Sequence, residues 1–173
     1  MPIVMTELLQ ELETIFKEHS AMIYRTAFGV TGSPADAEDV LQAIFVRLIR
    51  QFPLGLGKNP QAYLYRAAVN ASLNVIRERR RRREDSVDHA EGWEMSVPTN
   101  SLEKELEHRR LYEAIAELKP DVAQILILRY MHNKSDVEIA ELLGVSRGAI
   151  ALKLFRSRRR LKNLLRTKLE DES

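Results

Sequence analysis

Residues 135–161, SDVEIAELLGVSRGAIALKLFRSRRRL, decide the fold of this chain, because they have the pattern of two helices joined by a tight turn. Ser135 and Glu138 have the spacing of a capping box, in which each residue satisfies a backbone donor of the other at a helix start. Gly144 supplies the positive φ that such a turn requires. Ser146 is placed to cap the second helix. The stretch therefore predicts a helix-turn-helix.

The apolar residues of this pair recur at helical spacing and predict its buried face. We expect the first helix to bury Val137, Ile139, Leu142 and Leu143, and the second to bury Ile150, Leu154 and Leu161.

The second helix continues into a basic stretch. Between residues 147 and 168 there are nine Lys or Arg and no Asp or Glu. A basic surface of this kind binds DNA phosphates favourably because counterions are released, and a helix of this motif reads base edges in the major groove. The pattern favours DNA binding over the alternative, a solvated amphipathic helix pair.

The rest of the sequence is also helical in pattern, with no strand-like alternation. Gly32 ends one predicted helix, and Ser33-Pro34 starts the next. Residues 53–60, with two prolines and two glycines, form a loop before a helix that Asn59 caps. We therefore expect an all-α chain of two small helical domains. Their bounds are residues 1–83 and 102–173, with an acidic flexible linker at 84–101.

Charge follows the same division. The chain carries a net charge of only +2, but residues 1–83 carry +4, residues 84–110 carry −5 and residues 111–173 carry +3. Two basic blocks around an acidic middle suggest two modules that face nucleic acid.

The helix predicted after residue 60 carries the second site. An aromatic ring, amides and guanidiniums fall on one stripe of it, and such a mixture suits the faces and edges of unstacked bases. The alternative is the polar face of an ordinary bundle helix. The stripe consists of Tyr63, Arg66, Asn70, Asn74 and Arg77.

Enzyme chemistry finds little support. The chain has no cysteine, its four histidines lack metal-ligand spacing, and we identify no nucleotide-binding loop or nucleophile–base pair. We therefore predict no catalytic residue, no metal and no cofactor. No 18-residue apolar run or signal peptide is evident, so we expect a cytoplasmic protein without membrane insertion.

Three segments together resemble one known family. Residues 24–52, 59–82 and 118–161 are similar, in order and spacing, to the extracytoplasmic-function sigma factors of bacterial RNA polymerase. The resemblance implies a two-domain sigma factor whose partners are core polymerase (the β′ clamp helices and the β flap), promoter DNA and an anti-sigma factor.

The resemblance also assigns residues. It implies that the β′ clamp helices meet Asp36, Glu38, Asp39 and Gln42. The −10 element would be read and held open by Lys58, Asn59, Tyr63, Arg66, Asn70, Asn74 and Arg77. The −35 element would be contacted by Ser146, Arg147, Gly148, Lys153, Arg156, Arg159 and Arg160.

Two departures from the family pattern are present. The family usually has Gln-Glu-Thr where this chain has Gln42-Ala43-Ile44, which removes an acidic contact to the polymerase. It usually has Gly-Thr-Val-Lys-Ser where residues 148–152 read Gly-Ala-Ile-Ala-Leu, which removes a hydroxyl and an ammonium from the recognition helix.

Two rival functions are a sigma-like decoy that binds an anti-sigma factor but no DNA, and a helical nucleic-acid-modifying enzyme. The decoy would usually carry a receiver domain, and the enzyme would need a metal or nucleophile cluster.

For the acidic linker, two hypotheses stay open: its acids stand in for RNA phosphates in the polymerase, or they mask the basic modules of the free protein.

Overall fold

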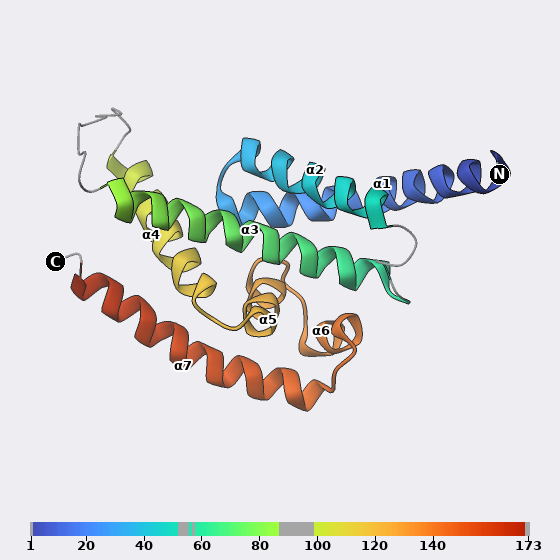
Figure 1. Ribbon diagram of the computed structural model, residues 1–173. Coiled ribbons are helices and arrows are strands. Elements are labelled where there is room, and N and C mark those ends of the chain that lie inside the picture. The colour runs from blue at the N-terminus through green and yellow to red at the C-terminus, as the bar shows by residue number, and fades with distance from the viewer. Residues whose placement is uncertain (1, 52–55, 57, 87–98, 172–173) are drawn as a thin grey trace. The chain divides into compact units, whose positions relative to one another are not determined.

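The structure, a computed structural model, describes residues 2–51, 56, 58–86 and 99–171 (Figure 1). Within these ranges the chain is helical and contains no strand, so the predicted all-α class is confirmed. The helices are α1 (Pro2–Thr31), α2 (Pro34–Gln51), α3 (Pro60–Asp85), α4 (Thr99–Ala116), α5 (Pro120–Tyr130), α6 (Asp136–Leu143) and α7 (Arg147–Asp171).

The chain divides into two compact units. The first contains Met1–Ser72 together with Leu142–Gly144, and the second contains Leu73–Glu141 and Val145–Ser173. The boundary falls inside α3, so the contacts group the second half of this helix with α4 to α7. The domain boundaries predicted from the sequence, at residues 83 and 102, stay a prediction.

In the first unit, α1 packs against α2 (Figure 1). Gly32, at φ 67°, ends α1 and donates its N–H to the carbonyl of Phe28 at 2.8 Å. Ser33 Oγ then accepts the N–H of Asp36 at 3.3 Å and caps α2. Both turn predictions are confirmed. The packing buries Ile23, Ala27, Val30, Ala37, Val40, Ile44 and Leu48.

Helix α3 begins where the sequence predicts, because Asn59 Oδ1 accepts the N–H of Ala62 at 3.0 Å. Its buried face is broader than the apolar pattern indicates. Ala71 and Val75, apolar residues in the second half of α3, are half-buried. The fully buried positions include Leu64, Tyr65, Ala68, Val69, Ser72 and Leu73.

Helices extend into both ends of the predicted linker. Helix α3 continues to Asp85, and α4 begins at Thr99, so both ends of the 84–101 segment are helical. Arg80 holds Glu84 in an i,i+4 ion pair at 2.7 Å, which favours continuation of α3. Residues 87–98 lie outside the described residues.

The helix-turn-helix is formed by α6 and α7. Ser135 donates its backbone N–H to Glu138 Oε2 at 2.8 Å, and Ser135 Oγ accepts the N–H of Glu138 at 3.2 Å, so the capping box is confirmed. Gly144 has φ 68°, as predicted for the turn. Ile139 and Ile150 are completely buried.

Three residues of this motif that we expected to be buried are not. Leu142 and Leu161 are half-buried, and Val137 is 45% exposed. Helix α6 has only eight residues, and its buried stripe falls on Ile139, Ala140 and Leu143. At about 100° per residue, Val137 lies roughly 110° from the centre of that stripe and therefore outside it.

The turn gives a direct stability prediction. Gly144→Ala should destabilise the protein by about 1–2 kcal/mol, because an L side chain resists positive φ, while a Cβ at this position would meet no atom within 4 Å. Gly148→Ala is the matched control: it also meets nothing within 4 Å, but Gly148 lies in α7. The control should be neutral or stabilising by up to about 1 kcal/mol. Urea unfolding measures both variants, and equal effects would contradict the prediction.

Candidate nucleic-acid interface

The predicted stripe on α3 is an accessible face of this helix. Tyr63 is half-buried, whereas Arg66, Asn70, Asn74 and Arg77 are exposed at steps of three and four residues. Residues at these spacings lie one above another on a helix. The structure thus brings the five residues onto one face, as the sequence predicts.

Several of these side chains are held in place. In the second unit, Arg77 Nη1 donates to Asn74 Oδ1 at 2.7 Å, and its Nε and Nη2 donate to the carbonyl of Ala116 at 3.0 and 2.8 Å. In the first unit, Arg66 Nη2 donates to the carbonyl of Leu143 at 3.0 Å. Nucleic acid that engages either guanidinium must replace these hydrogen bonds.

The loop before α3 is only partly described. Lys58 and Asn59 are exposed, and Asn59 is engaged as the helix cap. Leu56 is buried. Residues 52–55 and 57 lie outside the described residues.

Helix α2 carries the predicted polymerase-binding acids. Glu38, Asp39 and Gln42 are exposed, whereas Asp36 is half-buried in the first turn. Val46 and Ile49 are exposed apolar residues that our sequence reasoning missed. Their positions, four and seven residues after Gln42, could have revealed them, since these spacings continue one helix face. An acidic patch beside exposed apolar side chains suits a protein partner.

Helix α7 presents the predicted recognition face. Ser146 Oγ accepts the N–H of Ala149 at 3.2 Å and caps the helix. On the inner side, Ile150, Leu154 and Ser157 are buried. The exposed residues include Arg147, Gly148, Arg156, Arg159 and Arg160, and among the described residues none of the four arginines has an ion-pair partner.

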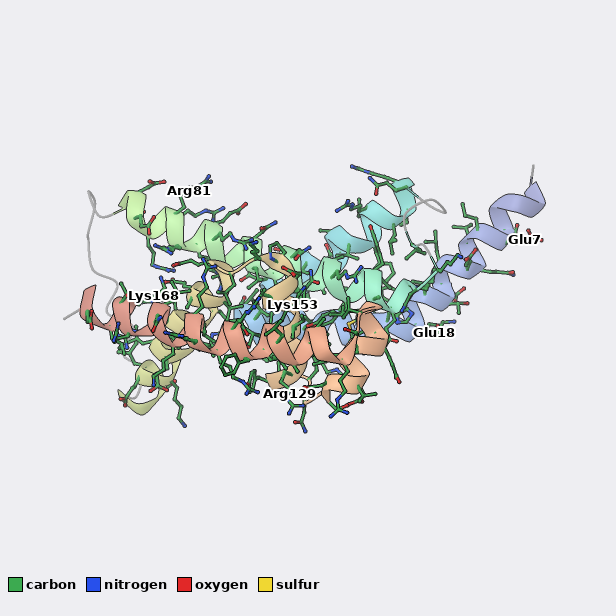
Figure 2. The ribbon with its side chains drawn as sticks, turned by 90° about the horizontal axis from the view of Figure 1, so that it is seen from below. Glu7, Glu18, Arg81, Arg129, Lys153 and Lys168 are labelled. Atoms are coloured by element: carbon green, nitrogen blue, oxygen red, sulfur yellow. The ribbon has the colours of Figure 1, made fainter. Side chains whose placement is uncertain are left out.

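The other cations of α7 differ from these arginines. Lys153, labelled in Figure 2, places Nζ 2.5 Å from Oδ2 of Asp121 on α5. The Lys153 hydrogen bond holds the pKa of Asp121 below its ordinary value. Arg158 donates from Nε to the hydroxyl of Tyr130 and lies over its ring at 5.7 Å. Lys153, which we assigned to DNA, is therefore also an intramolecular ion-pair partner.

An apolar groove of about 830 Å³ lies in the second unit and is lined by α4, α5 and α7. Leu111, Ile115 and Leu126 form part of its floor, and Leu165 and Leu169 line it from α7. Its lining also includes the cations Arg158, Lys162 and Arg166. Sequence reasoning missed this groove, although Leu161, Leu165 and Leu169 recur at four-residue steps.

Two family models match the chain: Sigma-70 region 2 matches residues 15–82, and Sigma-70, region 4, matches residues 108–161. The RNA polymerase sigma factor CarQ of Myxococcus xanthus is 30% identical over 160 residues, covering 88% of each chain. The chain belongs to the sigma-70 family.

Other relatives are named as extracytoplasmic-function sigma factors. SigL of Mycobacterium tuberculosis is 28% identical over 155 residues, covering 87% of this sigma factor and 86% of the relative. SigE of Mycolicibacterium smegmatis is 25% identical over 158 residues, but the match spans only 61% of that relative's length. This sigma factor thus belongs to the extracytoplasmic-function branch.

A solved structure supports the fold. CnrH, in complex with the cytosolic domain of CnrY, matches 92% of this sigma factor and 90% of its own chain, with a TM-score of 0.50 and 19% identity. Among the described residues, no helix is long and apolar enough to cross a membrane, and no three His, Asp or Glu side chains gather as a metal site would require.

The capping box predicts a pH dependence. The pKa of Glu138 falls from 4.5 to about 2, because its carboxylate accepts the N–H of Ser135 and also pairs with Lys134. A lowered pKa stabilises the fold above pH 4.5, and this stabilisation is lost as pH falls toward 2. Glu138→Gln should lower the melting temperature at pH 7, and the gap to the unsubstituted protein should close between pH 4.5 and 2. A gap that does not change with pH would contradict this.

The ion pair on α7 gives a second prediction. Asp121→Asn removes the partner of Lys153 and releases one cation for DNA phosphate. In duplex binding by the free protein, the slope of log K against log salt should steepen by about 0.9. The double variant Asp121→Asn, Lys153→Gln should return to the original slope. Steepening that survives in the double variant would mean that Lys153 is not the cation released.

Proposed function

We propose that the chain is a promoter-specificity subunit that directs core RNA polymerase to its promoters and starts DNA melting. The observation that carries the proposal is the match to sigma region 2 and sigma region 4 in one chain. Each matched region presents an exposed face with the chemistry its role needs. These are the amide and guanidinium stripe of α3 and the arginines of α7.

The DNA contacts follow from the two faces. The −35 duplex is contacted by the start and outer face of α7, where Arg147 lies in the first turn. The melted −10 strand is held by α3, because only unstacked bases expose both π-faces and hydrogen-bonding edges to Tyr63, Asn70 and Asn74.

The polymerase contacts use other surfaces. The β′ clamp helices bind α2 at Glu38, Asp39 and Gln42, with Val46 and Ile49 continuing the contact. The β flap binds the apolar groove. On α7 the groove is lined by Arg158 and by residues from Leu161 to Leu169, none of which is assigned to the −35 element, so region 4 can hold DNA and polymerase at the same time.

Regulation is by an anti-sigma factor that competes for these surfaces. The proposed role is non-enzymatic and belongs to the cytoplasm, where the polymerase works. The decoy alternative lacks support, because the relatives are named as sigma factors and the arginines of α7 are exposed.

The linker hypotheses concern acids that follow the arginine run at the end of α3. Glu84 pairs with Arg80, and Glu78 lies 3.7 Å from Arg82, so part of the arginine run is neutralised within α3 itself. Asp88, Glu91 and Glu94 lie outside the described residues, so the choice between RNA mimicry and masking stays open for them.

Asn70 tests the −10 assignment. Asn70→Ala removes an exposed amide from the α3 stripe and should reduce open-complex formation at least several-fold while leaving core binding unchanged. Permanganate reactivity of −10 thymines reports melting, and fluorescence titration with core polymerase reports assembly. Gln42→Ala, on the exposed face of α2, is the matched amide control and should show the reverse pattern. Loss of core binding by the Asn70 variant would reject the assignment.

Leu169 tests the groove. This side chain lines the groove and is 50% exposed. Leu169→Ser should weaken holoenzyme assembly roughly fivefold, because burial of half a leucine contributes about 1 kcal/mol. Duplex binding by the free protein should not change. A variant that assembles normally would remove the groove from the polymerase interface.

A further inference from the structure

The outer face of α7 is apolar near the start of the helix. Leu152 is 47% exposed and Phe155 is 71% exposed. With Gly148 they stand at steps of four and three residues, on the side of the helix opposite Ile150 and Leu154, which are buried. This stripe lies in the first third of the helix that the proposed function docks on the −35 element.

The charges around the stripe indicate what covers it. Arg156 follows Phe155 directly, and Arg159 lies one helical turn after Phe155 on the same face. Both are exposed and have no ion-pair partner among the described residues. This arrangement suits a polyanion whose phosphates bind the guanidiniums while an apolar group of the same molecule packs on the stripe. In the major groove of DNA, that group is the C5-methyl of thymine.

The spacing along α7 suits this role. Leu152 and Phe155 lie five and eight residues after Arg147, about 7.5 and 12 Å along the axis. The major groove is about 12 Å wide, so both side chains fall within it when the start of α7 enters. Side chains three residues apart on a helix are separated by about 5–6 Å. Since base pairs are stacked about 3.4 Å apart, the two side chains reach neighbouring or next-but-one pairs.

We propose that Leu152 and Phe155 read thymine methyl groups in the −35 element, so that this sigma factor recognises part of its promoter through apolar contacts. Leu152 stands where the resemblance to the family would place a serine hydroxyl. The specificity of this chain therefore moves from hydrogen bonding toward A·T pairs whose methyl groups face the stripe. The inference rests on the proposed docking of α7 at the −35 element.

The test uses holoenzyme assembled from core polymerase and the full chain. A −35 element is first selected from a randomised promoter library by in vitro transcription. Each thymine of the selected element is then replaced by deoxyuridine, which removes only the methyl group. At one or two positions the replacement should weaken the affinity of the holoenzyme for the promoter about fourfold. The reason is that a buried methyl-sized group contributes about 0.8 kcal/mol, and 1.4 kcal/mol corresponds to a tenfold change in affinity.

The variants identify the side chain. Leu152→Ser should bind the thymine promoter about fourfold more weakly and lose its response to deoxyuridine at one position. Phe155→Ala should lose the response at the other. Leu102→Ser is the matched control, since Leu102 is also 47% exposed but lies on α4. It should respond to deoxyuridine as the unsubstituted protein does.

The outcomes separate this inference from the proposed function. A selected −35 element without A·T pairs, or one indifferent to deoxyuridine, overturns the methyl readout. If base-pair changes at −35 still alter transcription, the proposed function survives that failure. If no −35 change and no Arg147→Ala substitution has any effect, the docking of α7 itself is wrong. If Leu152→Ser instead weakens only polymerase or anti-sigma binding, the stripe is a protein contact and the inference fails.

Discussion

The burial of Ile150 and Leu154 fixes the rotation of α7 about its own axis, and the recognition surface depends on that rotation. With these side chains in the core, the opposite positions, Leu152 and Phe155, must face outward. Gly144 and the cap at Ser146 set where the helix begins. A shift of one residue in the start would turn each outward side chain by about 100°. The core of region 4 thereby determines which side chains of α7 are exposed, and in the proposed function these are the ones that reach DNA.

Electrostatic pairing then divides the cations of the chain. Lys153 and Lys168 are held by Asp121 and Glu117 at 2.5 and 2.9 Å, whereas Arg156 and Arg159 have no such partner among the described residues. An exposed ion pair is worth little for stability. These ion pairs matter instead for DNA binding, because a paired lysine ammonium must leave its carboxylate before it contacts a phosphate. Those cations contribute less to counterion release than their number suggests.

The two matched regions share one organisation. In the proposed function, each uses one face for nucleic acid and another for protein. In region 2 these are the polar stripe of α3 and the acidic and apolar face of α2. In region 4 they are the outer face of α7 and the apolar groove beside Leu165 and Leu169. A promoter-specificity subunit needs this separation, because it binds polymerase and DNA together.

The sequence by itself determined what depends on neighbours in the chain. The capping box of Ser135, the positive φ of Gly144 and the cap at Asn59 were all predicted, because backbone conformation and i,i+3 hydrogen bonds are local. The periodicity of apolar residues likewise predicted the helices and the polar stripe of α3.

Only the tertiary structure decided which of the residues that look alike in the sequence are exposed, buried or paired. Val137 was predicted to be a core residue and is exposed, while Phe155 and Leu152 are exposed to solvent on a helix that carries several arginines. Lys153 resembles its basic neighbours in the sequence, but Asp121 holds it from 32 residues away. Such outcomes depend on which helix packs against which face, and local spacing carries no information about the partner that arrives from a distant part of the chain.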